Sequence, residues 1–363
     1  MPHLISRADR DQAPRTGLRA ALAGLSPSYF ALVMATGIVA IAAELQGRPL
    51  IAAVLFDLNV VAYGLLWLLS LLRLAWHPRR MAADLADHHR GPGFFTTVAA
   101  TCVLGSQMLL AGHPGPALAL WLLGALLWFA LTYAIFAALA VRHDKPSLAE
   151  GIHGGWLLAV VATQSVAVLG ALLAAQAPQP WRLELNFLAL SMWLWGGMLY
   201  IWTMTLIFYR YVFFRFSPGD LAPPYWINMG AMAISTLAGA RLIANAPEAP
   251  FLASLLPFLK GFTVFYWATA SWWIPMLVVL ALWRHLWRRF PLRYDPLYWG
   301  AVFPLGMYAV CSAEMAQAMT LDFLSWIPPV FLYAALAAWG LTFYGMLRSL
   351  LRRRDDQPAA EAS

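Results

Sequence analysis

The sequence predicts an all-α integral membrane protein in which ten transmembrane helices form five consecutive helical hairpins. Three observations lead to this fold class. Hydrophobic residues make up 61% of the 363 residues and charged residues only 11%, whereas soluble domains carry roughly 25% charged residues. The apolar residues come in runs long enough to cross a hydrocarbon core about 30 Å thick. The basic residues gather in every second connection between these runs.

Ten apolar runs, separated by proline, glycine or charged residues, account for most of the chain. A crossing needs about 20 helical residues, and each run has close to that length or more. The predicted spans are 28–46, 50–72, 93–111, 117–141, 152–175, 184–208, 225–245, 255–283, 296–319 and 323–347. We therefore expect one transmembrane domain over 27–348, between an N-terminal tail (1–26) and a C-terminal tail (349–363).

The Lys and Arg residues predict how these spans are oriented. Only four of the 24 basic residues lie outside the two tails and the alternate connections, namely Arg48, Arg182, Arg241 and Lys260. Because basic residues are retained on the cytoplasmic side, we expect both termini to be cytoplasmic in a multi-pass protein of the cell's inner (plasma) membrane. The same residues explain the net charge of +7 through anionic lipid headgroups, so no nucleic-acid partner is predicted.

The connections on the opposite side are short, and they predict the pairing of the spans. QGRP (46–49), GHPGP (112–116) and TLD (320–322) leave room only for tight turns. Spans joined by such turns pack as antiparallel helical hairpins. The chain therefore reads as five hairpins in sequence, without a soluble domain.

Within each hairpin the first span is rich in small and polar residues and the second is bulky. The third span, for example, carries Thr96, Thr101 and Gln107, whereas the sixth carries Trp193 and Trp202. A polar side chain is costly in lipid unless it faces another helix or water. Small residues also serve close helix packing alone, but their repetition in all five hairpins favours an inner ring of first spans around a pathway.

The ninth span contains residues that disfavour a straight, lipid-facing helix. Pro304 removes a backbone hydrogen bond, so it is expected to kink or interrupt the helix. Gly300 and Gly306 add little bulk nearby. An aromatic ring beside such a bend, Phe303, suits a movable hydrophobic constriction. From the residues alone, ordinary core packing is the alternative for Phe303.

Four ionisable residues fall at one depth inside the spans. Counted at 1.5 Å per helical residue, Glu44, Asp57, Arg241 and Glu314 lie about 22–25 Å from the cytoplasmic side. Buried charges need partners, so we expect Arg241 to pair with Glu314 or Glu44. The prediction is a structural ion-pair layer lining an outer vestibule, and a proton-coupling site is the second interpretation.

No metal, cofactor or enzymatic activity is predicted. Cys102 and Cys311 lie singly in apolar runs, and no HExxH or CxxC motif accompanies the loop histidines His77, His88 and His89. A serine–histidine pair or a catalytic carboxylate pair with a recognisable role is also missing from the sequence pattern.

Five segments carry a resemblance to a known family. They are PSYFALVMATGIVA (27–40), GGWLLAVVATQSVAVLGA (154–171), PPYWINMGAMAISTLAG (223–239), YWATASWWIPMLVVLALWRH (266–285) and YDPLYWGAVFPLGMYA (294–309). In this order they resemble the tellurite-resistance/C4-dicarboxylate transporter family, which includes TehA-like bacterial proteins and plant slow anion channels.

The resemblance implies ten helices around a central pore, a homotrimer in the lipid bilayer, and passage of small inorganic or organic anions. It also implies that a phenylalanine on the ninth helix plugs the pore, and the matching position is Phe303. Two other functions stay open: a proton-coupled C4-dicarboxylate carrier, and an exporter of an oxyanion such as tellurite or sulfite. Sequential hairpins without an evident inverted repeat modestly favour a channel. The residues do not identify the anion.

Overall fold

The protein is seen in a computed structural model that describes residues 18–355, with side chains to residue 351. The expectations for residues 1–17 and 356–363, which belong to the two predicted tails, lie outside the described residues. All regular secondary structure in the described part is helical, so the all-α prediction is confirmed. Ten helices have fifteen residues or more: α2 (Ala31–Leu45), α3 (Pro49–Trp76), α5 (Phe95–Leu110), α6 (Pro114–Val141), α8 (Leu158–Gln176), α9 (Trp181–Phe213), α10 (Ile227–Asn245), α12 (Leu256–Leu282), α13 (Trp299–Met319) and α14 (Ile327–Asp355).

Shorter helical segments connect or extend these long helices. Four are short α-helices: α1 (Leu18–Ala23), α4 (Pro78–Leu85), α7 (Leu148–Gly151) and α11 (Pro250–Ser254). One is a π-helical turn at the end of α12, η7 (Trp283–Trp287). The rest are 3-10 turns: η2 (Pro27–Phe30), η3 (Gly91–Phe94), η4 (Gly154–Leu157), η5 (Pro223–Trp226), η6 (Ala246–Glu248), η8 (Pro296–Tyr298) and η9 (Asp322–Leu324).

The same local structure precedes every first helix of a hairpin. The turns η2, η3, η4, η5 and η8 lead directly into α2, α5, α8, α10 and α13, and each combines proline or glycine with an aromatic residue. Proline suits the first turn of a helix because that turn has no acceptor for its N–H. The hairpins are therefore five copies of one structural unit.

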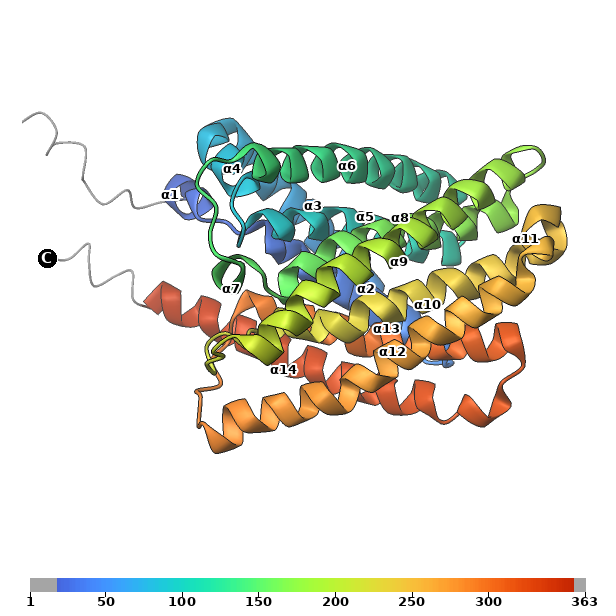
Figure 1. Cartoon of the computed structure of the whole chain (residues 1–363). Coiled ribbons are helices and arrows are strands. Elements are labelled where there is room, and N and C mark those ends of the chain that lie inside the picture. The colour runs from blue at the N-terminus through green and yellow to red at the C-terminus, as the bar shows by residue number, and fades with distance from the viewer. Residues whose placement is uncertain (1–17, 356–363) are drawn as a thin grey trace, which may run out of the picture.

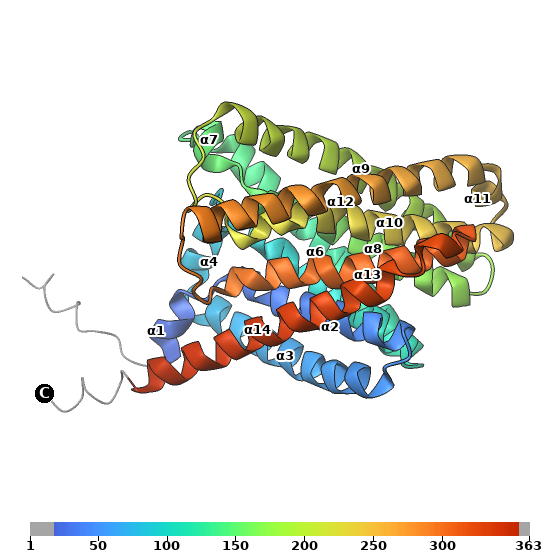
Figure 2. The ribbon, with the colours of Figure 1, turned by 90° about the horizontal axis from the view of Figure 1, so that it is seen from below.

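The first helices of the hairpins close into a ring. Helix α2 packs on α5, α5 on α8, α8 on α10, α10 on α13, and α13 returns to α2. Figures 1 and 2 show these helices running side by side through the middle of the bundle. The α5 and α8 spans are 89% and 94% buried, against 22% for α6 and for α12, so the predicted separation into inner and outer helices is present.

Each outer helix bridges two neighbouring units. It packs on the inner helix of its own hairpin and also on the next inner helix: α3 on α5, α6 on α8, α9 on α10, α12 on α13, and α14 on α2. Large apolar side chains on its outward side are exposed, for example Leu126 at 65% and Leu341 at 74%. Such exposure is what a lipid-facing surface requires.

In the described part of the chain, nine helices are long and apolar enough to cross a membrane. Helix α13 is outside this set because Pro304, Glu314 and Gln317 lower its hydropathy, yet it completes the inner ring. Helix α1 and the last turn of α14 lie at the same end of the bundle (Figures 1 and 2). The protein is thus an all-α membrane protein.

Candidate functional site

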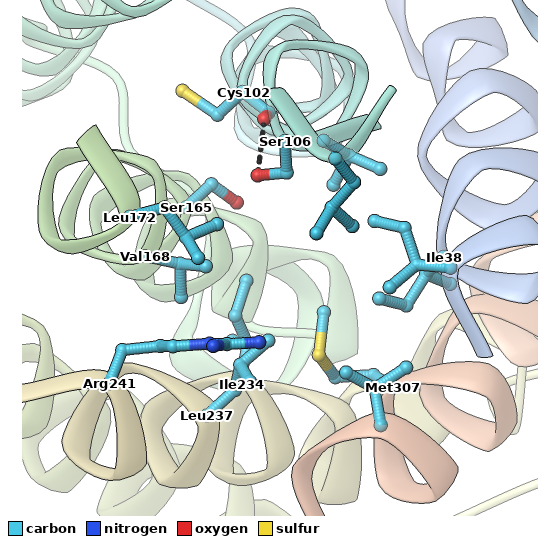
Figure 3. Close-up of a pocket in the computed structure, with 14 residues that line it drawn as sticks. Ile38, Cys102, Ser106, Ser165, Val168, Leu172, Ile234, Leu237, Arg241 and Met307 are labelled. Atoms are coloured by element: carbon cyan, nitrogen blue, oxygen red, sulfur yellow. Dashed lines mark hydrogen bonds between the residues drawn. The ribbon is translucent and has the colours of Figure 1, made fainter. Parts of the chain in front are cut away.

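A cavity lies inside the inner ring, and about 430 Å³ within it, counting the part open to solvent, is not occupied by protein atoms. All five inner helices contribute to its wall, which is mostly apolar (Figure 3). The residues that line it are Ile38, Ile41, Cys102, Val103, Ser106, Leu110, Ser165, Val168, Leu172, Ile234, Leu237, Arg241, Met307 and Val310. Apart from the adjacent Cys102 and Val103, they recur on each helix at intervals of three or four, as residues on one helical face do.

The hydroxyl groups in the wall are already hydrogen-bonded within their own helices. Ser106 Oγ donates to the Cys102 carbonyl (3.0 Å) and Ser165 Oγ donates to the Val161 carbonyl (2.7 Å). Arg241 is the one charged residue among those that line the cavity, and Figure 3 shows its side chain extended along the α10 side. A guanidinium in a mainly apolar chamber favours the presence of an anion.

Arg241 is joined to Glu314 in an ion pair between α10 and α13. The Glu314 side chain is only 9% exposed and that of Arg241 is 25% exposed. Arg241 Nε has no hydrogen-bond partner among the described residues. The ion pair therefore leaves the Nε donor of Arg241, a residue of the cavity wall, without a hydrogen-bond acceptor among the described residues.

The other two residues of the expected charged layer lie elsewhere. Glu44 is exposed near the end of α2, and Asp57 is exposed on α3. Neither forms an ion pair within residues 18–351. The expected layer of four is therefore reduced to Arg241 and Glu314, because a matching depth did not place the other two carboxylates on an inward face.

Phe303 is completely buried on α13, on the same face as the cavity wall. It precedes Met307 by four residues and Val310 by seven, and both line the cavity. These intervals keep all three side chains on one stripe of the helix. Phe303 thus lies one helical turn beyond the cavity, toward the end of the bundle where η8 begins α13.

The small and kink-forming residues of α13 fit its neighbours on either side of Phe303. A Cβ at Gly230 of α10 would lie 2.7 Å from Pro304 Cγ, and one at Gly306 would lie 3.0 Å from Ile38 of α2. Gly300 has more room. Helix α13 continues through Pro304, so of the two expected outcomes the interruption is not met, and the kink stays a prediction.

Most polar side chains of the inner helices face outer helices and not the cavity. In four of the five units an outer Tyr or Trp is hydrogen-bonded to a hydroxyl of the next inner helix: Tyr63–Thr101, Trp128–Thr163, Trp267–Ser312 and Trp339–Thr36. In the fifth, Trp193 Nε1 donates to the Ser235 carbonyl (2.8 Å). Sequence reasoning missed these pairs, although the alternation of Trp-rich and Thr-rich helices was visible.

The loop histidines contribute to packing at the η8 end of the bundle. The His89 and His153 rings stack with centroids 5.2 Å apart. His153 accepts a hydrogen bond from the Gly155 N–H (3.1 Å) and contacts the His88 carbonyl (3.2 Å). Within residues 18–351, no three His, Cys, Asp or Glu side chains are grouped as a metal site requires.

Comparison with known proteins gives relatives over nearly the whole length. The family model of the voltage-dependent anion channel matches residues 24–347. An uncharacterized membrane protein of Mycobacterium tuberculosis (strain H37Rv) is 40% identical over 152 residues, which are 42% of this chain and 77% of that protein. An uncharacterized transporter of Methanocaldococcus jannaschii is 26% identical over 327 residues, covering 87% of this chain and 90% of its own.

The name of a third relative states a substrate. The sulfite efflux pump SSU1 of Trichophyton rubrum is 26% identical over 345 residues, covering 89% of this chain and 90% of its own. The family match spans all five hairpins described above. The resemblance found in the five sequence segments is thereby confirmed, and the chain belongs to the voltage-dependent anion channel (SLAC1) family of membrane transport proteins.

Proposed function

We propose that this protein lets small anions cross the membrane along the axis of the inner ring, and that Phe303 closes this path. One observation carries the proposal: a cavity walled by all five inner helices contains a guanidinium and ends one helical turn from Phe303. Hydrophobic constrictions close pathways by excluding water and hydrated ions. An anion held beside Arg241, which pairs with Glu314 eleven residues after Phe303 on α13, is then about three helical turns from the barrier.

The Arg241–Glu314 pair makes the proposed anion site a weak one. Glu314 offsets much of the attraction of Arg241 for an anion, because opposite charges within about 4 Å largely cancel at a distance. Conduction requires that binding be favourable enough for entry and weak enough for release. A partly neutralised guanidinium suits passage better than tight capture.

The proposal includes a topology and an assembly. Ten crossings would place α1 and the end of α14 on one side, as their common position in the bundle requires. The basic connections make that side cytoplasmic in the inner (plasma) membrane. By analogy with the family, the assembly is a homotrimer in which every chain has its own path.

A coupled carrier is the second candidate function. The observation that favours it is Glu314, a carboxylate that is almost completely buried and is paired with Arg241, the charged residue of the cavity wall. A proton on Glu314 would release Arg241 to bind an anion. Proton and anion would then move together, as in proton relays built from buried carboxylates.

The experiment compares anion flux in proteoliposomes for the wild type and Phe303→Ala. Nitrate, chloride, sulfite and malate are tested, since a fungal relative is named a sulfite efflux pump. We expect the alanine variant to raise flux at least about tenfold, which corresponds to a barrier lower by about 1.4 kcal/mol. Phe95→Ala is the matched control because Phe95 is also buried but packs against Phe136 of the outer helix α6, with ring centroids 6.3 Å apart. An equal increase in both variants means leakage from damaged packing and contradicts the gate.

A pH gradient across the same vesicles separates the two candidates. For a channel, flux follows the anion gradient and is unchanged when the pH gradient is removed. For a carrier, the pH gradient drives uptake, and Glu314→Gln abolishes that drive while anion exchange remains. Glutamine keeps an oxygen that accepts from Arg241, so a general loss of structure is not the expected result.

A further inference from the structure

A second cavity lies away from the ring axis, at the end of the bundle where α12 finishes. About 370 Å³ within it, counting the part open to solvent, is not occupied by protein atoms. Tyr225 and Trp226 of η5, Arg284 and His285 of the π-helical turn η7, and Tyr298 of η8 contribute to its wall. Each of these side chains carries a group able to donate a hydrogen bond. The cavity is therefore richer in donors than the chamber inside the ring.

Arg284 is the centre of this second cavity, and it is 9% exposed. Its Nη1 donates to the Leu221 carbonyl, and its guanidinium lies over the Phe290 ring, 4.4 Å from the centroid. Its Nε has no hydrogen-bond partner among the described residues. A buried guanidinium with an unused donor is costly unless an anion completes it.

The other buried arginines at this end of the bundle have carboxylate partners, and Arg284 does not. Arg73 pairs with Asp84, and Arg210 pairs with Asp220. No carboxylate within residues 18–351 lies within 4 Å of the Arg284 guanidinium. Asp295, which follows in the chain, caps η8 by accepting from the Leu297 N–H (2.8 Å). Within the described residues, the place of a carboxylate beside the Arg284 guanidinium is thus left open.

We propose that this cavity binds the phosphate group of an anionic ligand, and that the ligand reaches it as a membrane lipid headgroup. Guanidinium groups bind phosphate oxygens through two parallel hydrogen bonds. Trp226 and Tyr298 supply further donors around the same space. The inference does not depend on anion passage through the ring, because none of the residues that line this cavity lines the cavity inside the ring.

The surroundings favour a lipid as the source of the phosphate. Arg288 and Arg289 follow directly after the π-helical turn, Arg293 comes four residues later, and all three are exposed. Clusters of basic residues next to the cytoplasmic end of a membrane helix attract anionic lipids, and basic pockets between helices bind their headgroups. The exposed arginines gather the lipid, and Arg284 holds its phosphate.

Lipid binding is tested on the purified full-length chain in detergent, by native mass spectrometry and thermal unfolding. Phosphatidylglycerol, phosphatidylcholine and inorganic phosphate are added separately. We expect phosphatidylglycerol to remain bound and to raise the unfolding temperature, since a ligand that binds only the folded state stabilises it. Phosphatidylcholine should leave that temperature unchanged. If inorganic phosphate stabilises as much as phosphatidylglycerol, the site is a soluble-phosphate site and the lipid assignment is overturned.

Three variants tie the effect to this cavity. Arg284→Gln removes the charge, and Ala301→Leu narrows the cavity while every charge is kept. Both should weaken phosphatidylglycerol binding at least about tenfold. Arg348→Gln is the control, because Arg348 is an exposed basic residue of α14 that does not line this cavity. This variant should bind phosphatidylglycerol as the wild type does. If the Arg284→Gln variant does not fold, phosphatidylglycerol binding by the Ala301→Leu variant is the test of the proposal. Undiminished binding by a folded Ala301→Leu variant overturns the proposal.

Discussion

Arg241 and Glu314 meet although 73 positions separate them in the chain. Their depth could be predicted because helical rise per residue is constant. The direction in which the two side chains point could not be predicted. Helices α10 and α13 are buried around most of their circumference, so their apolar residues do not mark one face of either helix. Glu44 and Asp57 show the consequence: their depth was also matched, yet both lie on exposed surfaces.

His153 supports the first prediction at the scale of single residues, a loss of stability in mild acid. Burial of its ring, with Arg210 and His89 nearby, lowers its pKa to about 4, although the His88 carbonyl and Asp87 act in the opposite direction. Its Nδ1 already accepts the Gly155 N–H, so a second proton has no place there. Between about pH 6.5 and 4, the His153 side chain binds a proton in the unfolded chain but stays neutral in the folded chain.

Stability should therefore be complete above about pH 6.5 and fall by about 2–3 kcal/mol as the pH approaches 4. Thermal or denaturant unfolding in detergent at a series of pH values measures this slope. The variant His153→Gln keeps a donor and an acceptor but does not titrate, so its slope should be smaller in that interval. His113→Gln is the control, because His113 is exposed after the end of α5, whereas His153 lies beside η4, which contacts η3 at the start of α5. Equal slopes for wild type and His153→Gln contradict the prediction.

At the scale of elements, the polar residues of the inner helices explain both a success and a failure of the sequence. Their abundance correctly indicated which helices lie inside. Their role was expected to be a lining for the pathway, but Thr36, Thr101, Thr163 and Ser312 are bonded to aromatic residues of outer helices. A hydroxyl group is kept away from lipid equally well when it faces water and when it bonds to an indole of a neighbouring helix. Composition therefore cannot distinguish a residue that lines a pathway from one that joins two helices.

The packing of α10 on α12 leads to a second prediction, which concerns one glycine. A Cβ at Gly239 would lie 2.2 Å from Thr263 Oγ1 and 3.1 Å from the Trp193 ring. Threonine is stiff at χ1, and both neighbours are buried, so the helices must move apart. We expect Gly239→Ala to lower the free energy of unfolding by about 1–3 kcal/mol.

The matched control for this packing prediction is Gly261→Ala on α12. A Cβ there has no other atom within 4 Å, and alanine is the better helix former by about 1 kcal/mol in water. Gly261→Ala should therefore be neutral or slightly stabilising when thermal unfolding is measured in the same detergent. If both variants unfold like the wild type, helix proximity at Gly239 is not what holds α10 against α12.

At the scale of the whole molecule, the sequence predicted the five hairpins and their order because membrane spans are long, apolar and separated by charged connections. It did not predict how the ring closes. That α13 returns to α2, and that each outer helix leans on the following unit, depends on the angle of each helix about its axis. Arg284 was counted only as a basic residue of a loop, because neither cavity is visible as a sequence pattern.

The last prediction concerns the number of crossings, which depends on α13. If α13 crosses the membrane, Arg293 before it and Asp322 after it lie on opposite sides, and both are exposed. The two native cysteines, Cys102 and Cys311, are buried, so the wild type should not react with a membrane-impermeant maleimide. In intact cells we expect Asp322→Cys to be labelled and Arg293→Cys to be labelled only after the membrane is opened. His113→Cys and Lys145→Cys, on either side of the strongly apolar α6, calibrate the two outcomes. Labelling of Arg293→Cys and Asp322→Cys from the same side would mean that α13 enters the ring without crossing, and the two ends of the bundle would then have to be reassigned.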